Sequence, residues 1–327
     1  MAAAQAPRSQ VPGLLRMLAK RMASSLLTLL LVSAVIFTIS GLLPGDAAQE
    51  TLGQSATPEQ VAALRHEMGL DRPAVTRYFD WLGGMVQGDP GQSLVANMPV
   101  REVIAERLPN SLMLAGFTAL VSVPLALAIG IASAISRGGR LDRALNVLTL
   151  SAVAVPEFLV ATIGVLIFSV KLLWLPSIAL VNDEATLWDT LRSCALPVFS
   201  LTVVVVAQMA RMTRAAVADQ LDRPYVEMAR LKGLAFRRVV LVHVMPNAIG
   251  PIVNAVALSL SYLMGGAIIV ETIFNFPGLA SLMVNAVTSR DMPLLQACAM
   301  IFCGIYLALV LFADVVAILA NPRLRAQ

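Results

Sequence analysis

Six uncharged or nearly uncharged blocks of membrane-spanning length dominate this sequence. A transmembrane helix needs about 20 apolar residues at about 1.5 Å rise per residue. The blocks that reach this length lie at about 22–44, 108–136, 144–170, 194–217, 242–270 and 293–319. Only 13% of the residues are charged, whereas a soluble domain carries about a quarter. We therefore expect an all-α, polytopic membrane protein with six transmembrane helices.

The distribution of Lys and Arg predicts the orientation of these spans. With the N-terminal segment 1–21 in the cytoplasm, the inner segments carry sixteen of the 24 Lys and Arg residues. Five of the remaining eight lie in one long external loop, 46–107, and long loops weigh little in the positive-inside rule. Both termini are therefore expected in the cytoplasm. The first block is too long for the apolar region of a signal peptide, so we expect it to persist as the first span.

The external loop is patterned rather than plain. Thr57 precedes Pro58 as a helix N-cap does, and a second amphipathic repeat follows Pro73. Gly83-Gly84 and Gly88 are expected to break that repeat. Two short helices on the outer membrane surface explain the spacing. Their function is open between a docking platform for an external protein and a cap over the bundle.

A basic loop at 219–241, between the fourth and fifth spans, predicts a short helix with a partner. Pro224 suits the first helical turn and Gly233 suits the position just past the end. A helix this short is only marginally stable alone in water. We therefore expect it to lie against another surface. Ala229 is small enough to admit a neighbouring protein, as a helix-in-groove contact requires. A loop held at anionic lipid headgroups is the simpler alternative. The residues expected to make the contact are Pro224, Tyr225, Glu227, Met228, Ala229, Lys232 and Gly233.

The same loop resembles the loop that marks the permease subunits of binding-protein-dependent ABC importers. That motif reads Glu-Ala-Ala, three residues, Gly, nine residues, then Ile-x-Leu-Pro. Glu227, Ala229, Gly233 and Pro246 match it at the expected spacing, while Met228 replaces the first Ala. His243 and Met245 replace the Ile and Leu. The resemblance implies that this helix is the coupling helix, which sits in a cleft of a separate ATPase.

Further segments resemble the dipeptide and oligopeptide branch of these permeases. They are Leu42-Leu43-Pro44-Gly45-Asp46, Leu70-Asp71-Arg72-Pro73, Gly88-Asp89-Pro90-Gly91, Arg107-Leu108-Pro109-Asn110 and Glu271-Thr272-Ile273-Phe274-Asn275. The long external loop indicates the B-type partner of a permease pair. The resemblance implies a type I ABC importer permease fold in the bacterial inner membrane, carrying dipeptides or short oligopeptides. Nickel chelates, glutathione and small glycans are alternative cargoes. The implied partners are a second homologous permease, two ABC ATPase subunits, an external substrate-binding protein and membrane lipid, without nucleic acid.

Chemistry-bearing motifs are sparse. No Gly-x-x-x-x-Gly-Lys sequence occurs, so ATP and Mg are expected on the ATPase subunits and no cofactor on this chain. The three cysteines, Cys194, Cys298 and Cys303, lack metal-like spacing, and His66 and His243 are the only histidines. No catalytic or metal site is expected, which disfavours a membrane-embedded enzyme. An ion-coupled secondary transporter using Glu157 and Asp314 remains an alternative that would need no ATP.

Several polar residues inside spans are candidates for the translocation path. Glu157 follows Pro156 about halfway along the third block, and a carboxylate at that depth faces the bundle interior or water. It either meets a cargo ammonium or belongs to a structural pair. Asn254, Ser261 and Tyr262 give the fifth span a polar side. Glu271, at its outer end, is expected to serve an external gate, a contact with the binding protein or a loop ion pair.

Overall fold

The computed structural model describes residues 11–42, 52, 56–67, 71–179 and 186–320, which form helices and one isolated bridge between Gln92 and Pro99. The long helices are α1 (Val11–Leu42), α5 (Val100–Ile135), α8 (Leu187–Leu221), α11 (Met245–Ile273) and α13 (Met292–Ala320). The short ones are α3 (Pro58–Glu67), α4 (Ala74–Gln87), α6 (Arg140–Ala154), α7 (Glu157–Gly164), η1 (Val165–Lys171), α9 (Pro224–Leu231), α10 (Phe236–Arg238), η2 (Val239–Val244) and α12 (Leu279–Thr288). The expected all-α class is confirmed.

Five helical stretches of the described residues are long and apolar enough to cross a membrane, and a sixth is added if the bent pair of α6 with α7–η1 is counted as one span. The span predicted at 144–170 corresponds to this bent pair and is not one continuous helix. The axes of α6 and of the following α7–η1 helix differ by 96°. Pro156 has no N–H to continue α6, and its ring holds Val155 extended, at φ −86° and ψ 124°. Glu157 therefore begins a new helix instead of lying inside a continuous one.

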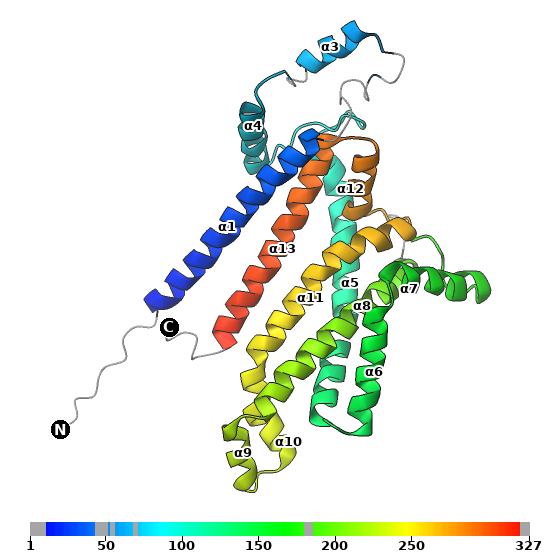
Figure 1. Ribbon diagram of the computed structural model, residues 1–327. Coiled ribbons are helices and arrows are strands. Elements are labelled where there is room, and N and C mark those ends of the chain that lie inside the picture. The colour runs from blue at the N-terminus through cyan, green and yellow to red at the C-terminus, as the bar shows by residue number, and fades with distance from the viewer. Residues whose placement is uncertain (1–10, 43–51, 53–55, 68–70, 180–185, 321–327) are drawn as a thin grey trace, which may run out of the picture.

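The long helices form a bundle whose centre is α5, α8 and α11 (Figure 1). Helix α13 packs against α11, α1 packs against α13, and α6 packs against α8. The Arg21 guanidinium of α1 lies 3.1 Å from the Asp314 carboxylate of α13. The first part of α1 is therefore beside the last part of α13. Helices α9 and α10 lie at one end of the molecule, here named the α9 end. Helices α4 and α12 lie at the opposite end, here named the α12 end.

Close contact between α5 and α8 depends on a glycine. A Cβ at Gly130 would lie 2.6 Å from the Ala210 carbonyl oxygen and 2.7 Å from the Thr213 Cβ. Small residues of this kind let helix backbones approach closely, which is how helices associate in lipid. The apolar core around this contact includes the fully buried Leu201 and Met209 of α8.

The helices extend beyond the predicted spans. Helix α1 starts at Val11, inside the segment 1–21 expected to precede the membrane, and α5 starts at Val100, inside the predicted external loop. Hydropathy marks only the apolar part of a helix, so polar turns that project beyond it are missed.

Within the described part of the predicted external loop lie the short helices α3 and α4, and Thr57 caps α3. The Gln60 N–H donates to Thr57 Oγ1 (3.3 Å), and the Thr57 N–H donates to Gln60 Oε1 (3.0 Å). Helix α4 ends at Gly88, which is left-handed at φ 79°. Gly83 and Gly84 lie within α4, so the break expected at them is wrong.

Helix α4 is fixed to the bundle at the α12 end. The Tyr78 hydroxyl of α4 hydrogen-bonds the Ser33 hydroxyl of α1 (2.8 Å), and the Phe37 ring packs edge-on against Tyr78. After α4, the chain returns to the bundle where Ser93 hydrogen-bonds the buried Asp291 carboxylate at the start of α13. The segment from α4 to Ser93 therefore packs on the bundle. This position suits both a docking platform for an external protein and a cap over the bundle.

Candidate functional site

Helix α9 lies where the loop sequence predicts a helix, with Pro224 as its first residue. Gly233 follows its end at φ 77°, in the left-handed region that favours glycine. The Gly233 N–H donates to the Arg230 carbonyl oxygen (2.9 Å), and the Leu234 N–H donates to that of Ala229 (3.3 Å). These bonds satisfy carbonyl groups that the last turn of a helix otherwise leaves unpaired.

One face of α9 is buried against its own bundle. Val226 and Ala229 pack in a cluster with Val217 of α8, Val239 of η2 and Ala248 of α11. Ala229 was expected to admit a neighbouring protein, but its side chain is 6% exposed and contacts this chain instead. The small side chain therefore lets α9 lie close to η2, and the expected role of Ala229 is corrected to internal packing.

The opposite face of α9 is apolar and exposed. Tyr225, Met228 and Leu231 are 39%, 58% and 76% exposed. Helix α9, which carries them, lies at the α9 end (Figure 1). Glu227 and Lys232 are exposed beside them, and Glu227 forms no ion pair with another described residue. Exposed apolar side chains on a short helix are the anchors of helix-in-groove binding.

Polar contacts orient α9 relative to the long helices. The Arg137 guanidinium, in the turn after α5, lies 2.6 Å from the Asp222 carboxylate just before α9. Arg223 donates to Asp219 (2.9 Å), and this hydrogen bond raises the pKa of the Arg223 guanidinium. Exposed pairs of this kind contribute little stability. Their effect is mainly to fix the direction in which α9 leaves α8.

The sequence reasoning missed an ion pair near the α9 end, between the buried Asp142 and the half-buried Arg214. Arg214 of α8 holds the Asp142 carboxylate of α6 with two hydrogen bonds, of 2.8 and 2.9 Å. The same carboxylate accepts from Ser133 of α5 (2.6 Å), from the Gly138 N–H (3.0 Å) and from Asn146 (2.6 Å). Three helices are therefore joined at one buried carboxylate. The partners are 72 positions apart, so spacing along the chain gave no signal.

Glu157 is the half-buried first residue of α7, directly after the bend. A Cβ at Gly266 of α11 would overlap the Glu157 carboxylate, so this glycine makes the room that the carboxylate occupies. Across the residues the structure describes, the Glu157 side chain has neither a hydrogen bond nor an ion pair. The structural pair considered for it is therefore not found within this part of the chain.

The other candidates on α11 divide between two environments. Asn254 and Tyr262 are exposed and, eight residues apart, lie on one face of the helix. Ser261 is buried, and its hydroxyl donates to the Ala257 carbonyl oxygen (2.8 Å). The exposed pair suits a path lined by α11, whereas Ser261 is satisfied within its own helix.

Glu271 is fully buried near the end of α11, where it caps α12. Its carboxylate accepts hydrogen bonds from the Ser111 hydroxyl (2.6 Å) and from the Ala280 and Ser281 N–H groups (2.8 and 2.9 Å). The Leu279 N–H donates in turn to Ser111 Oγ (2.7 Å). The first three N–H groups of α12 are thus satisfied, as at a helix N-cap. Neither the gate nor the loop ion pair expected of Glu271 describes this role.

Ser111→Ala should lower the free energy of unfolding by about 1–2 kcal/mol, because it removes a donor to a buried carboxylate and an acceptor for a buried N–H. Thermal unfolding of the purified protein in detergent measures this loss. Ser122→Ala is the matched control, because Ser122 is buried on the same helix and its hydroxyl has no partner in the described chain. Equal losses in both variants would contradict the capping role of Ser111.

The described residues contain no group of three His, Cys, Asp or Glu side chains able to hold a metal ion. Cys194, Cys298 and Cys303 are free thiols. Asp314, considered for ion coupling, is paired with Arg21. The described residues therefore offer a short helix with an exposed apolar face, a half-buried Glu157 carboxylate and a loop capped by Glu271.

Comparison with known proteins shows matches along most of the sequence. The family described as binding-protein-dependent transport system inner membrane component matches residues 126–326, and its N-terminal counterpart matches residues 14–115. A protein of Brucella abortus (strain 2308) named for a peptide transport system permease is 35% identical over 307 residues, 94% of this chain and 98% of the relative. Glutathione transport system permease protein GsiC of Pectobacterium atrosepticum is 36% identical over 306 residues, 94% of this chain and 97% of that protein.

Among solved structures, an inward-facing conformation of the MetNI methionine ABC transporter matches with a TM-score of 0.57. The match covers 67% of this chain and 96% of that chain at 15% identity, so it shows a likeness of fold alone.

Proposed function

The chain belongs to the family of binding-protein-dependent transport system inner membrane components, and on that premise we propose that its cargo is a dipeptide or short oligopeptide. As a member, it is the permease subunit of an ABC importer, a transport component and not an enzyme. The observation that carries the cargo proposal is the relative named for peptide transport, 35% identical over 94% of this chain. The relatives named for glutathione transport make glutathione the second candidate.

Uptake in a strain lacking this chain and the other peptide importers tests the cargo proposal. We expect uptake of labelled dipeptides to appear when the whole transport system is restored, and to be absent when only this subunit is omitted. Restored uptake of glutathione without any dipeptide uptake would transfer the assignment to the second candidate.

Membership implies ATPase and substrate-binding partners, and the protein is a multi-pass component of the bacterial inner membrane. The finer arrangement is proposed. A second homologous permease completes the path, two ABC ATPases each receive one coupling helix, and an external binding protein delivers cargo. ATP and Mg are bound by the ATPases, which is supported by the lack of a Gly-x-x-x-x-Gly-Lys loop in this chain.

We propose the orientation that sets the α9 end in the cytoplasm and the α12 end outside. The excess of Lys and Arg in the predicted inner segments supports it. The Arg21–Asp314 contact agrees with the part of this topology that sets both chain ends on the same side, because it joins the beginning of the first span to the end of the last. In this orientation the exposed face of α9 points toward the ATPases. The ion-coupled alternative loses support, since Asp314 is engaged by Arg21.

Glu157→Gln is expected to reduce cargo uptake several-fold while the complex still assembles, because it removes an unpaired carboxylate from the proposed path and keeps its volume. Uptake by proteoliposomes containing the whole importer measures the effect. Glu106→Gln, at an exposed carboxylate on α5, is the control. Normal uptake by the Glu157 variant would reject a role in the path.

A further inference from the structure

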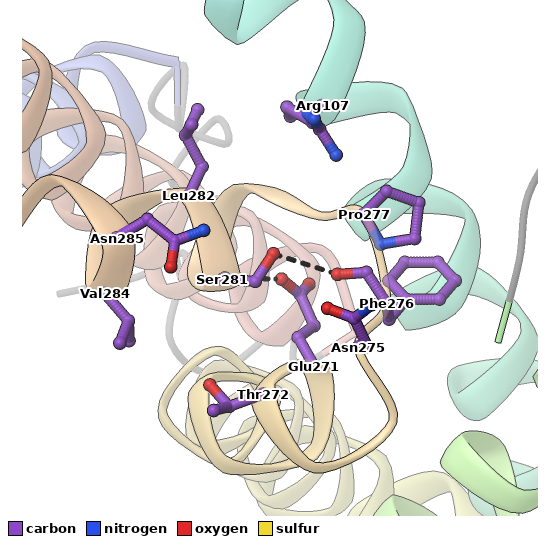
Figure 2. Close-up of a pocket in the computed structure, with 10 residues that line it drawn as sticks. All are labelled: Arg107, Glu271, Thr272, Asn275, Phe276, Pro277, Ser281, Leu282, Val284 and Asn285. Carbon is purple, nitrogen blue, oxygen red and sulfur yellow. Dashed lines mark hydrogen bonds between the residues drawn. The ribbon is translucent and has the colours of Figure 1, made fainter. Parts of the chain in front are cut away.

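A polar pocket of about 420 Å³ lies at the α12 end, and nothing described so far assigns it a ligand. Figure 2 shows Arg107 reaching toward it from α5, Asn285 and Ser281 on α12, and Asn275 and Phe276 on the loop between α11 and α12. Small-molecule sites have volumes of about 300–1,000 Å³. The pocket is therefore large enough for a small cargo molecule.

Arg107 supplies a cation without a partner. Its side chain is half-buried and forms no hydrogen bond or ion pair with other residues in the described ranges. The carboxylate in the lining, Glu271, is already bonded to Ser111 and to α12. A partly desolvated charge is costly unless it is paired. A guanidinium offers a planar fork of donors that fits a carboxylate with two hydrogen bonds, so a carboxylate is the ligand group this pocket favours.

The walls of the pocket are preformed. Asn275 is held left-handed at φ 47°, and the Phe276 N–H donates to the Glu271 carbonyl oxygen (2.8 Å). The Asn110 side chain of α5 donates to the Pro277 carbonyl oxygen (2.8 Å), which ties the loop to the helix that carries Arg107. A site fixed before binding loses little entropy on binding.

The rest of the lining suits an amphipathic ligand. Asn275 and Asn285 are exposed carboxamides, able to donate to or accept from a peptide group. Leu282 and Val284 add apolar surface for a side chain. One cation, neutral hydrogen-bonding groups and an apolar wall match the carboxyl-terminal part of a small peptide.

We propose that this pocket binds the free terminal carboxylate of a peptide cargo at the outer mouth of the path, with Arg107 holding the carboxylate. The inference rests on the cargo and orientation proposed above. Asn275 and Asn285 bind the adjoining peptide group, and the apolar wall contacts the last side chain. An acidic side chain of the binding protein is the competing ligand, and the experiment below separates the two.

The test compares labelled dialanine with dialanine amide, which lacks the charged carboxylate, in proteoliposomes containing the whole importer. Uptake of each is measured at saturating binding protein for wild type and for Arg107→Gln. The binding protein prefers the free acid over the amide to the same extent in both complexes. This preference therefore cancels when the acid-to-amide uptake ratio of the variant is divided by that of wild type. We expect the wild-type preference for the free acid to fall about tenfold in the variant, the size of one charge-assisted contact. The Arg107→Lys variant should retain part of the preference for the free acid, because lysine keeps the positive charge.

Arg101→Gln is the matched control, because Arg101 is an exposed arginine of the same helix outside the pocket. Its acid-to-amide ratio should equal that of wild type. If Arg107→Gln lowers uptake of both dipeptides equally, Arg107 serves the structure or the binding protein and the carboxylate site is overturned. If the wild-type complex imports neither dipeptide, the cargo proposal itself fails, which is a distinct result.

Discussion

Replacing Glu227 and Gly233 together by alanine is expected to lower the amount of cargo imported per ATP hydrolysed by about tenfold or more. Gly233 is left-handed at φ 77°, where a residue with a Cβ costs roughly 1–2 kcal/mol. A helix of 8 residues is marginal and loses its last turn at such a cost. Glu227 is an exposed acid in the first turn, where it stabilises the helix dipole and faces the proposed ATPase cleft. Weakened docking transmits less of the ATPase motion into the bundle.

The amount of cargo imported per ATP hydrolysed is measured directly by following cargo uptake and ATP hydrolysis in the same vesicles, which contain the reconstituted importer. Glu59→Ala with Gly88→Ala is the matched control, because Glu59 is also a first-turn acid. Gly88 is a left-handed glycine with open space around it, as Gly233 is. Both control residues lie in the predicted external loop. An unchanged ratio of uptake to hydrolysis in the α9 variant would show that α9 does not couple the two.

The elements that the sequence predicts well are those encoded locally. The spans follow from uninterrupted apolar length, and α9 follows from Pro224 and Gly233, because each signal lies within the element it predicts. The prolines inside spans are harder to interpret. Pro156 breaks its span, whereas α5 continues through Pro124 and α11 through Pro251. Neighbouring helices decide whether the freed carbonyl groups can be tolerated, and the sequence does not display those neighbours.

The site residues were predicted less well, for the same reason. Residue spacing located α9, but it did not show that Ala229 packs against this chain instead of a neighbouring protein. Glu271 was expected at a gate or in a loop ion pair because it lies at the end of a span. Its hydrogen-bond partner Ser111 lies 160 positions away, so the sequence did not reveal the capping role. The pocket beside it needed Arg107 of α5 and Asn285 of α12 to be brought together by the fold. Long-range hydrogen bonds decide these roles, and no local pattern encodes them.

Asp142→Ala is expected to lower the free energy of unfolding by about 3–5 kcal/mol, the largest loss of stability predicted for this chain. Asp142 is 5% exposed, and its removal leaves the Arg214 guanidinium, held by two hydrogen bonds in the native protein, without its carboxylate. Ser133 also loses its acceptor. Titration of the purified protein with denaturing detergent in mixed micelles measures the change.

The double variant Asp142→Leu with Arg214→Met shows whether the loss comes from an unpaired charge. Replacing both ions by apolar side chains removes the desolvation cost together with the attraction, so we expect most of the stability to return. A double variant as unstable as the single one would instead show that the network stabilises by its hydrogen bonds to Ser133, Gly138 and Asn146. A stable Asp142→Ala variant would contradict both explanations. The distinction bears on transport, because this carboxylate joins α5, α6 and α8, and α8 ends at Leu221, just before the helix proposed to receive the ATPase motion.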